Sequence, residues 1–397
     1  MIPDGAILAI NAGSSSLKFG LFCSGGQGPV PLLSGGLTHL DDPSPRFAVT
    51  AADGTVIAQE EWAGRDRHAD VAALLQWVET HLGGVELSGV GHRVVHGGRD
   101  FCAPVLIDDA VVARLDALTP LAPLHQPASL APVRKFRALR PDLPQIACFD
   151  TAFHHGLAPP VSRYGLPRAL EAEGIRKYGF HGLSYESIAA QLDVVDDGAR
   201  AQRIVVAHLG GGASLCAMRD LASVDTTMGF TALDGLVMGT RPGALDPGIL
   251  LYLQRAKGWS VDQLEHFFYH ECGLLGVSGV SSDVATLVAS HRPEASEALA
   301  LFAFQVGKQV AAMASTLGGL DRLVFTGGIG EHSPEVRSMI ANRLRWLGVV
   351  LDDEANAKGL VTLSADRSLV RLQLFPAREE LTIAGHVLAC LRDHPCR

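Results

Sequence analysis

Residues 6–23 read AILAINAGSSSLKFGLFC, and this stretch decides the fold. Apolar residues over 6–10 and again over 17–23 predict two strands, separated by a turn of small residues at 11–16. The chain therefore enters a second strand where a Rossmann or P-loop unit would enter a helix. The small turn residues expose backbone N–H groups and hydroxyls with little bulk, which suits a phosphate group.

The same arrangement recurs near mid-chain. A strand over 203–207, a glycine turn over 208–212 and a second strand over 213–218 predict another hairpin. Two such hairpins about half a chain apart indicate two related domains. A third glycine-rich turn is expected at 327–330, after a short strand. One such turn is typical of an ordinary β-turn, whereas three of them, with Lys18 beside the first, favour phosphate binding.

The rest of the chain mixes predicted helices and strands. A length of 397 residues exceeds one ordinary core, so two domains are expected, with a boundary near residue 150. Proline clusters at 119–127 and 140–144 predict loops. Strands are expected at 145–149 and 369–375, and helices at 68–82, at 108–118, from 333 onward and at 379–391.

Composition narrows the class of protein. A net charge of -9 argues against a nucleic-acid partner, and 47% hydrophobic with 19% charged residues is typical of a compact globular chain. Seven scattered cysteines without a C-x-x-C pair predict neither a disulfide framework nor a zinc ribbon. The N-terminus lacks signal-peptide features, and the alanine-rich stretch 295–317 contains polar residues that favour a buried helix over a membrane span. We therefore expect a cytoplasmic protein.

Two arginines and one lysine are candidates for binding an anion. Arg93 lies in GHRVVHGG and Arg241 in MGTRPG, both beside glycine and apolar neighbours. Such arginines either form structural ion pairs or capture a carboxylate or phosphoryl group with two parallel hydrogen bonds. Lys18 can reach a phosphate oxygen as a point charge.

Other polar residues have both a functional and a structural interpretation. His181, in YGFHGLS, can donate to an anion or be a satisfied core histidine. Asp150 follows an expected strand, a common place for a catalytic carboxylate, or it caps a helix. Glu379 and Glu380 begin the last helix, where the helix dipole alone favours acids.

The 16 histidines raise the question of a zinc hydrolase. His92 and His96 are four residues apart, but they lie in a strand-like segment and would not share a helix face. His154 and His155 are adjacent. These positions do not give the helical H-E-x-x-H pattern that a catalytic zinc favours.

Taken together, ten segments resemble the acetate kinase family over nearly the whole chain, in order. They are INAGSSSLKF, HRVVHGG, LAPLHQP, FDTAFH, KYGFHGLS, HLGGGAS, DTTMGFTALDGLVMGTRPGALDPG, GLLGVSGVSSD, FTGGIGEHSPEVR and EELTIA. The resemblance implies two ribonuclease-H-like α/β domains of the actin and sugar-kinase ATPase type, with mixed sheets flanked by helices. Residues 1–150 with the C-terminal helix 379–397 would form one domain, and 151–378 the nucleotide-binding and dimerisation domain. It also implies a homodimer that binds its substrates in an interdomain cleft, without nucleic acid or membrane.

The implied reaction is reversible, Mg²⁺-dependent in-line transfer of the ATP γ-phosphoryl group to acetate, giving acetyl phosphate and ADP. Mn²⁺ is the alternative metal. The resemblance assigns the metal to Asn11 and Glu379. It assigns catalysis to Asp150, His181, Arg241, Arg93 and His125, and the substrate site to Arg93, Val95, Leu124 and Phe180. It assigns the nucleotide to Lys18, Ser14, Ser16, His208, Leu209, Gly210, Gly211, Gly212, Asp283, Gly328, Ile329, Gly330, Glu331 and His332.

The chain departs from the family pattern at several positions. On the nucleotide side, Gly211 and His332 each stand where the family has Asn, and Ala285 where it has Arg; these changes put the choice of ATP as donor in doubt. Near the acyl site Ala232 replaces a Pro, which can admit propionate. Gln126 replaces an Asn beside His125, and Tyr185 replaces a His.

Four alternatives therefore remain open from the sequence. The chain can be a propionate or butyrate kinase, or use a phosphoryl donor other than ATP. From other classes, it can be an actin-like assembly ATPase, against which Arg93 and His181 argue, or a zinc hydrolase. Acetate is already ionised at neutral pH and needs no general base, so cations that bring two anions together suit the kinase chemistry.

Overall fold

The structure is a computed structural model that describes residues 5–13, 16–25, 28–38, 44–62 and 67–393. The chain divides into two compact units. Unit 1 contains Met1–Phe153 and Arg378–Arg397, and unit 2 contains His154–Ala377. Each unit has a mixed sheet with helices, so the expected α/β class is confirmed.

Unit 1 is built on a sheet with the strand order β5-β4-β3-β2-β1-β6-β8-β7 among the described residues. The strands from β1 to β5 are antiparallel neighbours, and β1, β6 and β8 are parallel. The predicted first hairpin is confirmed, since Ala12 pairs with Leu17 across the turn. The bounds are β1 (Ala6–Ala12), β2 (Ser16–Gly25), β3 (Gly28–Thr38), β4 (Arg46–Ala51), β5 (Val56–Glu61), β6 (Leu87–Val94), β7 (Val105–Leu106) and β8 (Gln145–Phe149).

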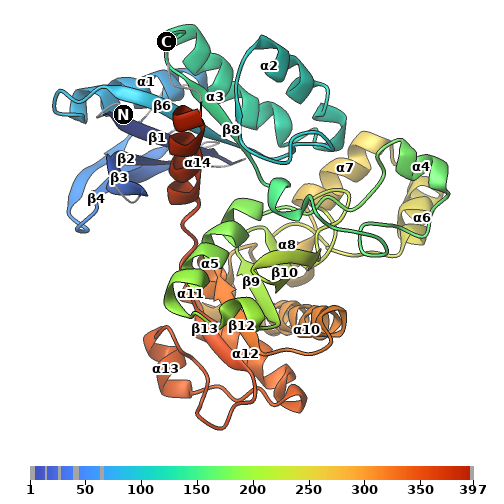
Figure 1. The fold of residues 1–397 in the computed structure, drawn as a ribbon. Helices are drawn as coiled ribbons and strands as arrows, with labels where there is room; N and C mark the ends of the chain where they lie inside the picture. Colours follow the sequence, from blue (N-terminus) through green and yellow to red (C-terminus); the bar gives the residue numbers. More distant parts are fainter. Residues whose placement is uncertain (1–4, 14–15, 26–27, 39–43, 63–66, 394–397) are drawn as a thin grey trace. The chain divides into compact units, whose positions relative to one another are not determined.

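Helices cover this sheet, and α14 lies against β1 and β6 (Figure 1). An aromatic cluster forms where Phe19 and Phe47 of the sheet contact Trp77 of α1. Trp62, which follows β5, stacks on Phe47 in the same cluster. A β-carbon at Gly91 of β6 would lie 2.3 Å from Ile383 Cγ2, so glycine there lets α14 pack directly on the strand. The bounds are α1 (Arg67–His81), α2 (Asp109–Asp116), α3 (Gln126–Leu139) and α14 (Glu379–Asp393).

Unit 2 repeats the central part of this topology. Its described strands follow the order β11-β10-β9-β12-β13, with β11, β10 and β9 antiparallel and β9, β12 and β13 parallel. The order and directions match β3-β2-β1-β6-β8 of unit 1. The second predicted hairpin is therefore confirmed and takes the place that β1 and β2 take in unit 1. The bounds are β9 (Ile204–Leu209), β10 (Ala213–Arg219), β11 (Ala222–Thr226), β12 (Arg322–Thr326) and β13 (Arg371–Leu374).

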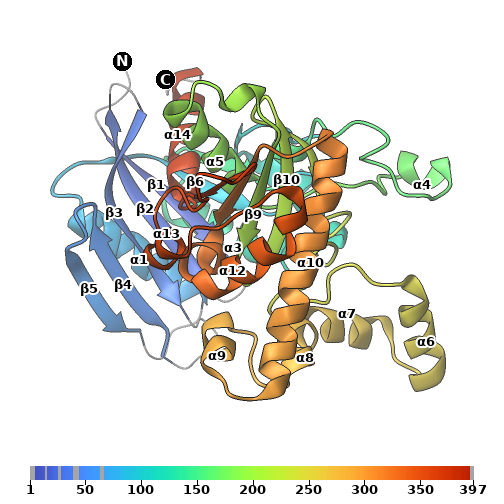
Figure 2. The same cartoon turned by 90° about the horizontal axis from the view of Figure 1, so that it is seen from below.

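The helices of unit 2 include the long helix α10, which runs beside β10 (Figure 2). Among the described residues, α10 alone is long and apolar enough to cross a membrane by length and composition. Half of that apolar stretch is buried, and its residues Phe302, Val306 and Val310 are inaccessible, as in a core helix. The bounds are α4 (Arg168–Ala172), α5 (Gly182–Val195), α6 (Pro247–Lys257), α7 (Val261–His270), α8 (Gly273–Ser278), α9 (Val284–Ala289), α10 (Pro293–Leu317), α11 (Gly327–His332), α12 (Pro334–Arg343) and α13 (Asp353–Lys358).

The predicted turn at 327–330 is wrong, because these residues begin the short helix α11. Gly327 has φ +77°, and its N–H donates to Glu331 Oε1 at 3.0 Å, which holds the start of the helix. A side chain at Gly327 would meet the backbone oxygen of Leu209 at 2.8 Å. Gly327 therefore allows the close approach of α11 to β9. The expected loop at 119–127 is also partly helical, since α3 begins at Gln126.

We expect Gly91→Ala to destabilise unit 1 by about 1–3 kcal/mol, because the added methyl group overlaps Ile383 and Val387 of α14. Thermal unfolding measures the effect. Gly385→Ala is the matched control, since a β-carbon at Gly385 of α14 would meet no atom within 4 Å. Equal melting temperatures for Gly91→Ala and the unmodified protein would contradict the close packing of α14 on β6.

Candidate active site

In unit 1, the neighbouring parallel strands β1, β6 and β8 bring polar residues to one edge of the sheet. Asn11 lies near the end of β1, Arg93 near the end of β6, and Asp150 directly after β8. The first turn of α14 adds Glu379 and Glu380. The carboxyl edge of an open α/β sheet is where such proteins commonly bind ligands.

Arg93 is held in place by two acceptors. Its Nε lies 3.0 Å from both carboxylate oxygens of Asp150, its Nη2 lies 2.5 Å from Asp150 Oδ2, and its Nη1 lies 3.1 Å from Asn11 Oδ1. Burial would lower the pKa of Arg93, but the Asp150 carboxylate outweighs it and holds that pKa above its ordinary value. These contacts use three of the five guanidinium N–H groups, so one on each Nη can donate to a second anion.

Asn11 also joins the two glutamates. Its Nδ2 donates to Glu379 Oε2 at 2.8 Å and to Glu380 Oε1 at 3.2 Å. Burial raises the pKa of Glu379, and the Asp150 charge adds to this while Arg93 opposes it. Burial, followed by the Glu379 charge, raises the pKa of Glu380. Negative charge is therefore concentrated at this edge.

These oxygen donors fit Mg²⁺, which prefers carboxylate and carbonyl ligands and commonly takes one or two carboxylates together with substrate phosphates. A divalent cation would also relieve the repulsion that raises the pKa of both glutamates. Within the part of the chain that the structure describes, no group of three or more His, Cys, Asp or Glu side chains forms a complete metal cage.

Other expected residues of unit 1 surround this cluster. Lys18 of β2 is paired with Asn11 in the sheet and, with Glu380, lines a groove of about 850 Å³. Ser16 begins β2, whereas Ser14 lies outside the described residues. Both Ser16 and Lys18 follow the turn of the first hairpin.

The segment that follows Arg93 is fixed by Gln126, a role that the sequence did not reveal. Gln126 is buried; its amide nitrogen donates to the backbone oxygens of His96 and Leu115, and its Oε1 accepts from the His96 N–H at 3.1 Å. The expected acyl-site residue Val95 is buried beside this clamp, whereas Leu124 is 39% exposed. His125 occupies the N-cap position of α3, directly before Gln126.

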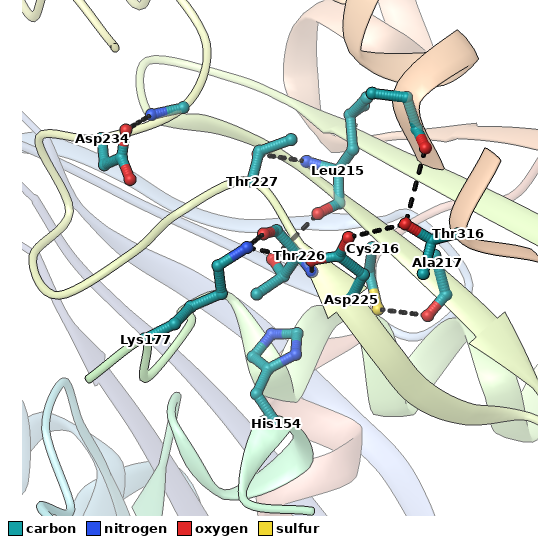
Figure 3. Close-up of polar contacts among 12 residues, drawn as sticks. His154, Lys177, Leu215, Cys216, Ala217, Asp225, Thr226, Thr227, Asp234 and Thr316 are labelled. Carbon is teal, nitrogen blue, oxygen red and sulfur yellow. Dashed lines mark hydrogen bonds and ion pairs between the residues drawn. The ribbon is translucent and has the colours of Figure 1, made fainter. Parts of the chain in front are cut away.

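In unit 2, His181 is the N-cap residue that precedes α5, and its backbone is in the left-handed region with φ 58°. The chain that leads to it is held from one side by Lys177, which lies 2.9 Å from Asp225 Oδ1 and from the Thr226 carbonyl oxygen. Figure 3 shows these contacts, with Thr316 donating to the other oxygen of Asp225. The ion pair therefore holds the corner formed by Lys177–His181 against the end of β11.

His154 holds the same corner from within the core, and sequence reasoning missed this role as well. Its Nε2 donates to the Phe180 carbonyl oxygen at 3.0 Å, and its Nδ1 lies 2.7 Å from Ser223 Oγ. Burial lowers the pKa of His154 to about 4, so the ring is neutral near pH 7. Phe180, an expected wall of the acyl site, is itself buried.

The glycine turn between β9 and β10 lies beside two imidazoles and a guanidinium. A β-carbon at Gly212 would lie 3.2 Å from His181 Nε2 and 3.9 Å from Arg241 Nη1. A β-carbon at Gly210 would lie 3.7 Å from His208 Nε2. The missing side chains leave a space bordered by the Nε2 atoms of two imidazoles and one guanidinium, which suits a phosphoryl group.

Arg241 is oriented by its own surroundings. Its Nη1 donates to the Ala232 carbonyl oxygen at 3.2 Å, and its guanidinium lies 5.6 Å from the ring centroid of Tyr269. Gly211 next to this site has open space, since a β-carbon there would meet no atom within 4 Å. Packing therefore does not require the glycine that departs from the family pattern.

The remaining expected nucleotide residues of unit 2 have structural contacts of their own. Asp283 caps α9 by accepting from Thr286, and this hydrogen bond lowers the pKa of Asp283. Glu331 accepts from the N–H groups of Gly327 and Ala377 at 3.0 Å each. The other members are Leu209 at the end of β9 and Gly328, Ile329, Gly330 and His332 in α11.

Two of the histidines that raised the question of zinc, His92 and His96, are buried in unit 1. His92 Nε2 lies 2.9 Å from the side chain of Gln145, and His96 Nδ1 accepts from the Gly98 N–H at 2.8 Å. Burial lowers the pKa of His92 and of His96 to about 4. Their contacts are those of core histidines.

These buried histidines predict a loss of stability in acid. The unfolded chain binds protons at His92 below its ordinary pKa of 6.5, whereas the folded chain resists protonation down to about 4. The free energy of unfolding should therefore fall as pH falls from about 6.5 to about 4, by up to about 3 kcal/mol for this histidine. Urea denaturation at several pH values measures the slope.

His92→Phe should make that slope shallower, because phenylalanine binds no proton. His291→Phe, at an exposed position, is the control and should keep the slope of the unmodified protein. A slope that is the same with and without His92 would contradict the assignment of acid sensitivity to this ring.

Comparison with known proteins agrees with this geometry. The chain matches the acetokinase family over residues 6–385. It is 48% identical over 387 residues to an acetate kinase of Rhodopseudomonas palustris, covering 96% of this chain and 97% of that protein. It is 42% identical over 395 residues to a propionate kinase of Citrobacter rodentium, covering 96% of each.

Solved structures show the same fold. The crystal structure of Porphyromonas gingivalis acetate kinase has a TM-score of 0.84 at 33% identity and covers 98% of this chain and 100% of that one. A propionate kinase from Francisella tularensis has a TM-score of 0.88 at 34% identity and covers 96% and 98%. The chain belongs to the acetokinase family.

Proposed function

We propose that this chain is an acetate kinase that transfers the γ-phosphoryl group of ATP to acetate and forms acetyl phosphate and ADP, reversibly. The observation that carries the proposal is the group of His181, His208 and Arg241 around the glycine turn of unit 2. It is a cradle for a phosphoryl group, and unit 1 supplies Arg93 for a carboxylate.

Acetate is ionised at neutral pH, so the acceptor needs neutralisation of charge rather than a general base. Arg93 has two N–H groups that can bind the carboxylate, and Asp150 fixes the orientation of the guanidinium. Asp150 therefore acts as a positioning residue that holds a cation. Val95, Leu124, His125 and Phe180 are proposed to line the acyl side of the site.

The donor side uses the residues of unit 2. His181 and Arg241 donate to the equatorial oxygens of the transferred phosphoryl group, whose negative charge spreads in an in-line transfer. Gly210, Gly211 and Gly212 give the phosphates room, and Lys18 adds a point charge. We assign the nucleotide to α11 and Asp283 by family resemblance, and we place the reaction in the cytoplasm, where ATP is available.

Mg²⁺ is the proposed metal, with Mn²⁺ as the alternative. Asn11 and Glu379 would hold it: Glu379 supplies a carboxylate oxygen, and Asn11 Oδ1, which accepts one hydrogen bond from Arg93, has a second lone pair. When bound, the ion would neutralise phosphate charge during transfer. Glu380 would add a second carboxylate to the same edge.

Propionate is the second candidate acceptor. Ala232 is almost fully buried, and its carbonyl oxygen binds the guanidinium of Arg241, so its small side chain borders the reactive site. The family pattern has a larger proline at this position. Relatives of this chain include both acetate and propionate kinases.

A homodimer is also proposed, with α6 as part of the contact. Its apolar residues are exposed in the single chain, with Ile249 at 42%, Leu250 at 38%, Leu251 at 52% and Tyr252 at 66%. Four neighbouring apolar side chains on one helix are typical of a surface that a second protein covers. The family resemblance points to a second copy of this chain as that protein.

Kinetics of two arginine variants test the proposed reaction. With acetate, ATP and Mg²⁺, the purified protein should form acetyl phosphate in a hydroxamate assay. Arg93→Ala should mainly raise KM for acetate, because it removes a contact made before and during transfer. Arg241→Ala should mainly lower kcat, by about 100-fold or more, because it removes charge stabilisation of the transition state.

Arg200→Ala is the matched control, since Arg200 pairs with Asp193 through two hydrogen bonds but on an exposed surface. It should change neither constant. Absence of turnover above the Arg241→Ala background would refute the proposed function. Running propionate and other phosphoryl donors in the same assay decides the acceptor and the donor by kcat/KM.

Leu251→Asp should shift the protein from dimer to monomer, because it places a charge in the apolar surface of α6. Light scattering after size exclusion measures the mass. Val194→Asp, at a valine of α5 that is 85% exposed, is the control and should stay dimeric. A dimer that survives Leu251→Asp would remove α6 from the interface.

A further inference from the structure

The two histidines of the unit 2 cradle are fixed by a reciprocal pair of serines. His181 precedes α5 and its Nδ1 lies 2.8 Å from the hydroxyl of Ser214 on β10. His208 lies on β9 and its Nδ1 lies 2.8 Å from the hydroxyl of Ser184 on α5. The histidine that precedes α5 thus binds a serine of the sheet, and the histidine of the sheet binds a serine of α5. Both Nε2 atoms are left on the side of the glycine turn.

Tyr185 sets the direction of one of these hydrogen bonds. Its hydroxyl lies 2.5 Å from Ser214 Oγ, so the serine hydroxyl lies between a phenol and the His181 ring. A serine has one hydrogen and can donate to only one of the two. Tyr185 is fully buried, and burial raises its pKa well above 10, so the phenol keeps its proton. A phenol that donates to Ser214 leaves the serine hydrogen for Nδ1 of His181.

The stacking of the rings also disfavours two charged imidazoles. The centroids of His181 and His208 lie 4.3 Å apart, with 23° between the ring planes. Two imidazolium rings at this separation would repel one another. The guanidinium of Arg241, which faces the same side of Gly212, adds a third positive charge to that repulsion.

We propose that Ser214, supported by Tyr185, and Ser184 are positioning residues that hold His181 and His208 as neutral rings with hydrogen on Nε2. The partner of one imidazole nitrogen decides which nitrogen carries the proton. A serine that donates to Nδ1 therefore leaves the Nε2 hydrogen to point at the glycine turn. Both rings then present an Nε2–H group on the side of the glycine turn, and Arg241 supplies the positive charge.

The role of this arrangement rests on the proposed function, since the ligand of the two N–H donors would be the transferred phosphoryl group. No proton moves in this scheme. The rings donate hydrogen bonds to equatorial oxygens, and their protonation state stays the same through the reaction. Binding of a doubly charged phosphoryl group then does not require acid conditions.

Nitrogen NMR of the full-length protein labelled at histidine tests the assignment without substrate. Two-bond proton–nitrogen correlations distinguish a nitrogen that carries hydrogen from one that does not. His181→Gln and His208→Gln assign the signals. Near neutral pH, both rings should show hydrogen on Nε2 and a bare Nδ1. An imidazolium pattern for either ring, or hydrogen on Nδ1, would overturn the proposal.

Variants then test the serines. In Ser214→Ala, and to a smaller extent in Tyr185→Phe, the His181 signals should move toward the form with hydrogen on Nδ1, while His208 keeps its pattern. Ser184→Ala should do the same for His208. An unchanged His181 spectrum in Ser214→Ala would contradict the proposal. If Ser214→Ala does not fold, Tyr185→Phe and the unmodified spectrum decide.

Kinetics provide an independent readout. Ser214→Ala should lower kcat by roughly 10- to 100-fold, since a misdirected donor loses transition-state contact, and should leave KM for acetate unchanged. Ser129→Ala removes a buried hydroxyl of unit 1 and is the control with unaltered kcat. A kcat for Ser214→Ala equal to that of the control would overturn the proposal. Should the protein lack acetate kinase activity, the NMR result still decides the positions of the protons, so the two failures are distinguishable.

Discussion

The ion pair between Arg93 and Asp150 is the interaction on which the half-site of unit 1 depends. Asp150 is buried, and an unpaired charge in such a place would cost several kcal/mol. The bidentate contact removes that cost and also fixes the plane of the guanidinium. Because Asn11 binds both Arg93 and the two glutamates, one network joins the expected carboxylate site to the expected metal site.

Unit 2 orients its groups by a different means. Lys177 and His154 fix the corner that carries His181, while the Ala232 carbonyl and the Tyr269 ring hold Arg241. The Ala232 carbonyl oxygen and the Tyr269 ring are neutral, whereas the carboxylate of Asp150 holds Arg93.

Much of the fold could be predicted because its signals are local. Apolar stretches separated by small turn residues predicted both hairpins, and Asp150 could be placed because it directly follows the apolar strand at 145–149. The helix at 327–332 was missed because glycines normally indicate a turn, and the contact that explains Gly327, with Leu209, lies far away in the sequence. Gln126 and His154 were missed as positioning residues for the same reason. The His154 contact with Ser223 joins residues 69 positions apart, and no local pattern reveals such a pair.

Tyr185 shows how a departure from the family pattern can be consistent with the chemistry. A neutral histidine at this position can carry its hydrogen on either ring nitrogen, so it could donate to Ser214 or accept from it. A buried phenol keeps its proton throughout the physiological range, because burial raises its pKa further. The phenol therefore always has a hydrogen that it can donate to Ser214. Since Ser214 also contacts His181, this is consistent with the proposed donation from Ser214 to Nδ1 of His181.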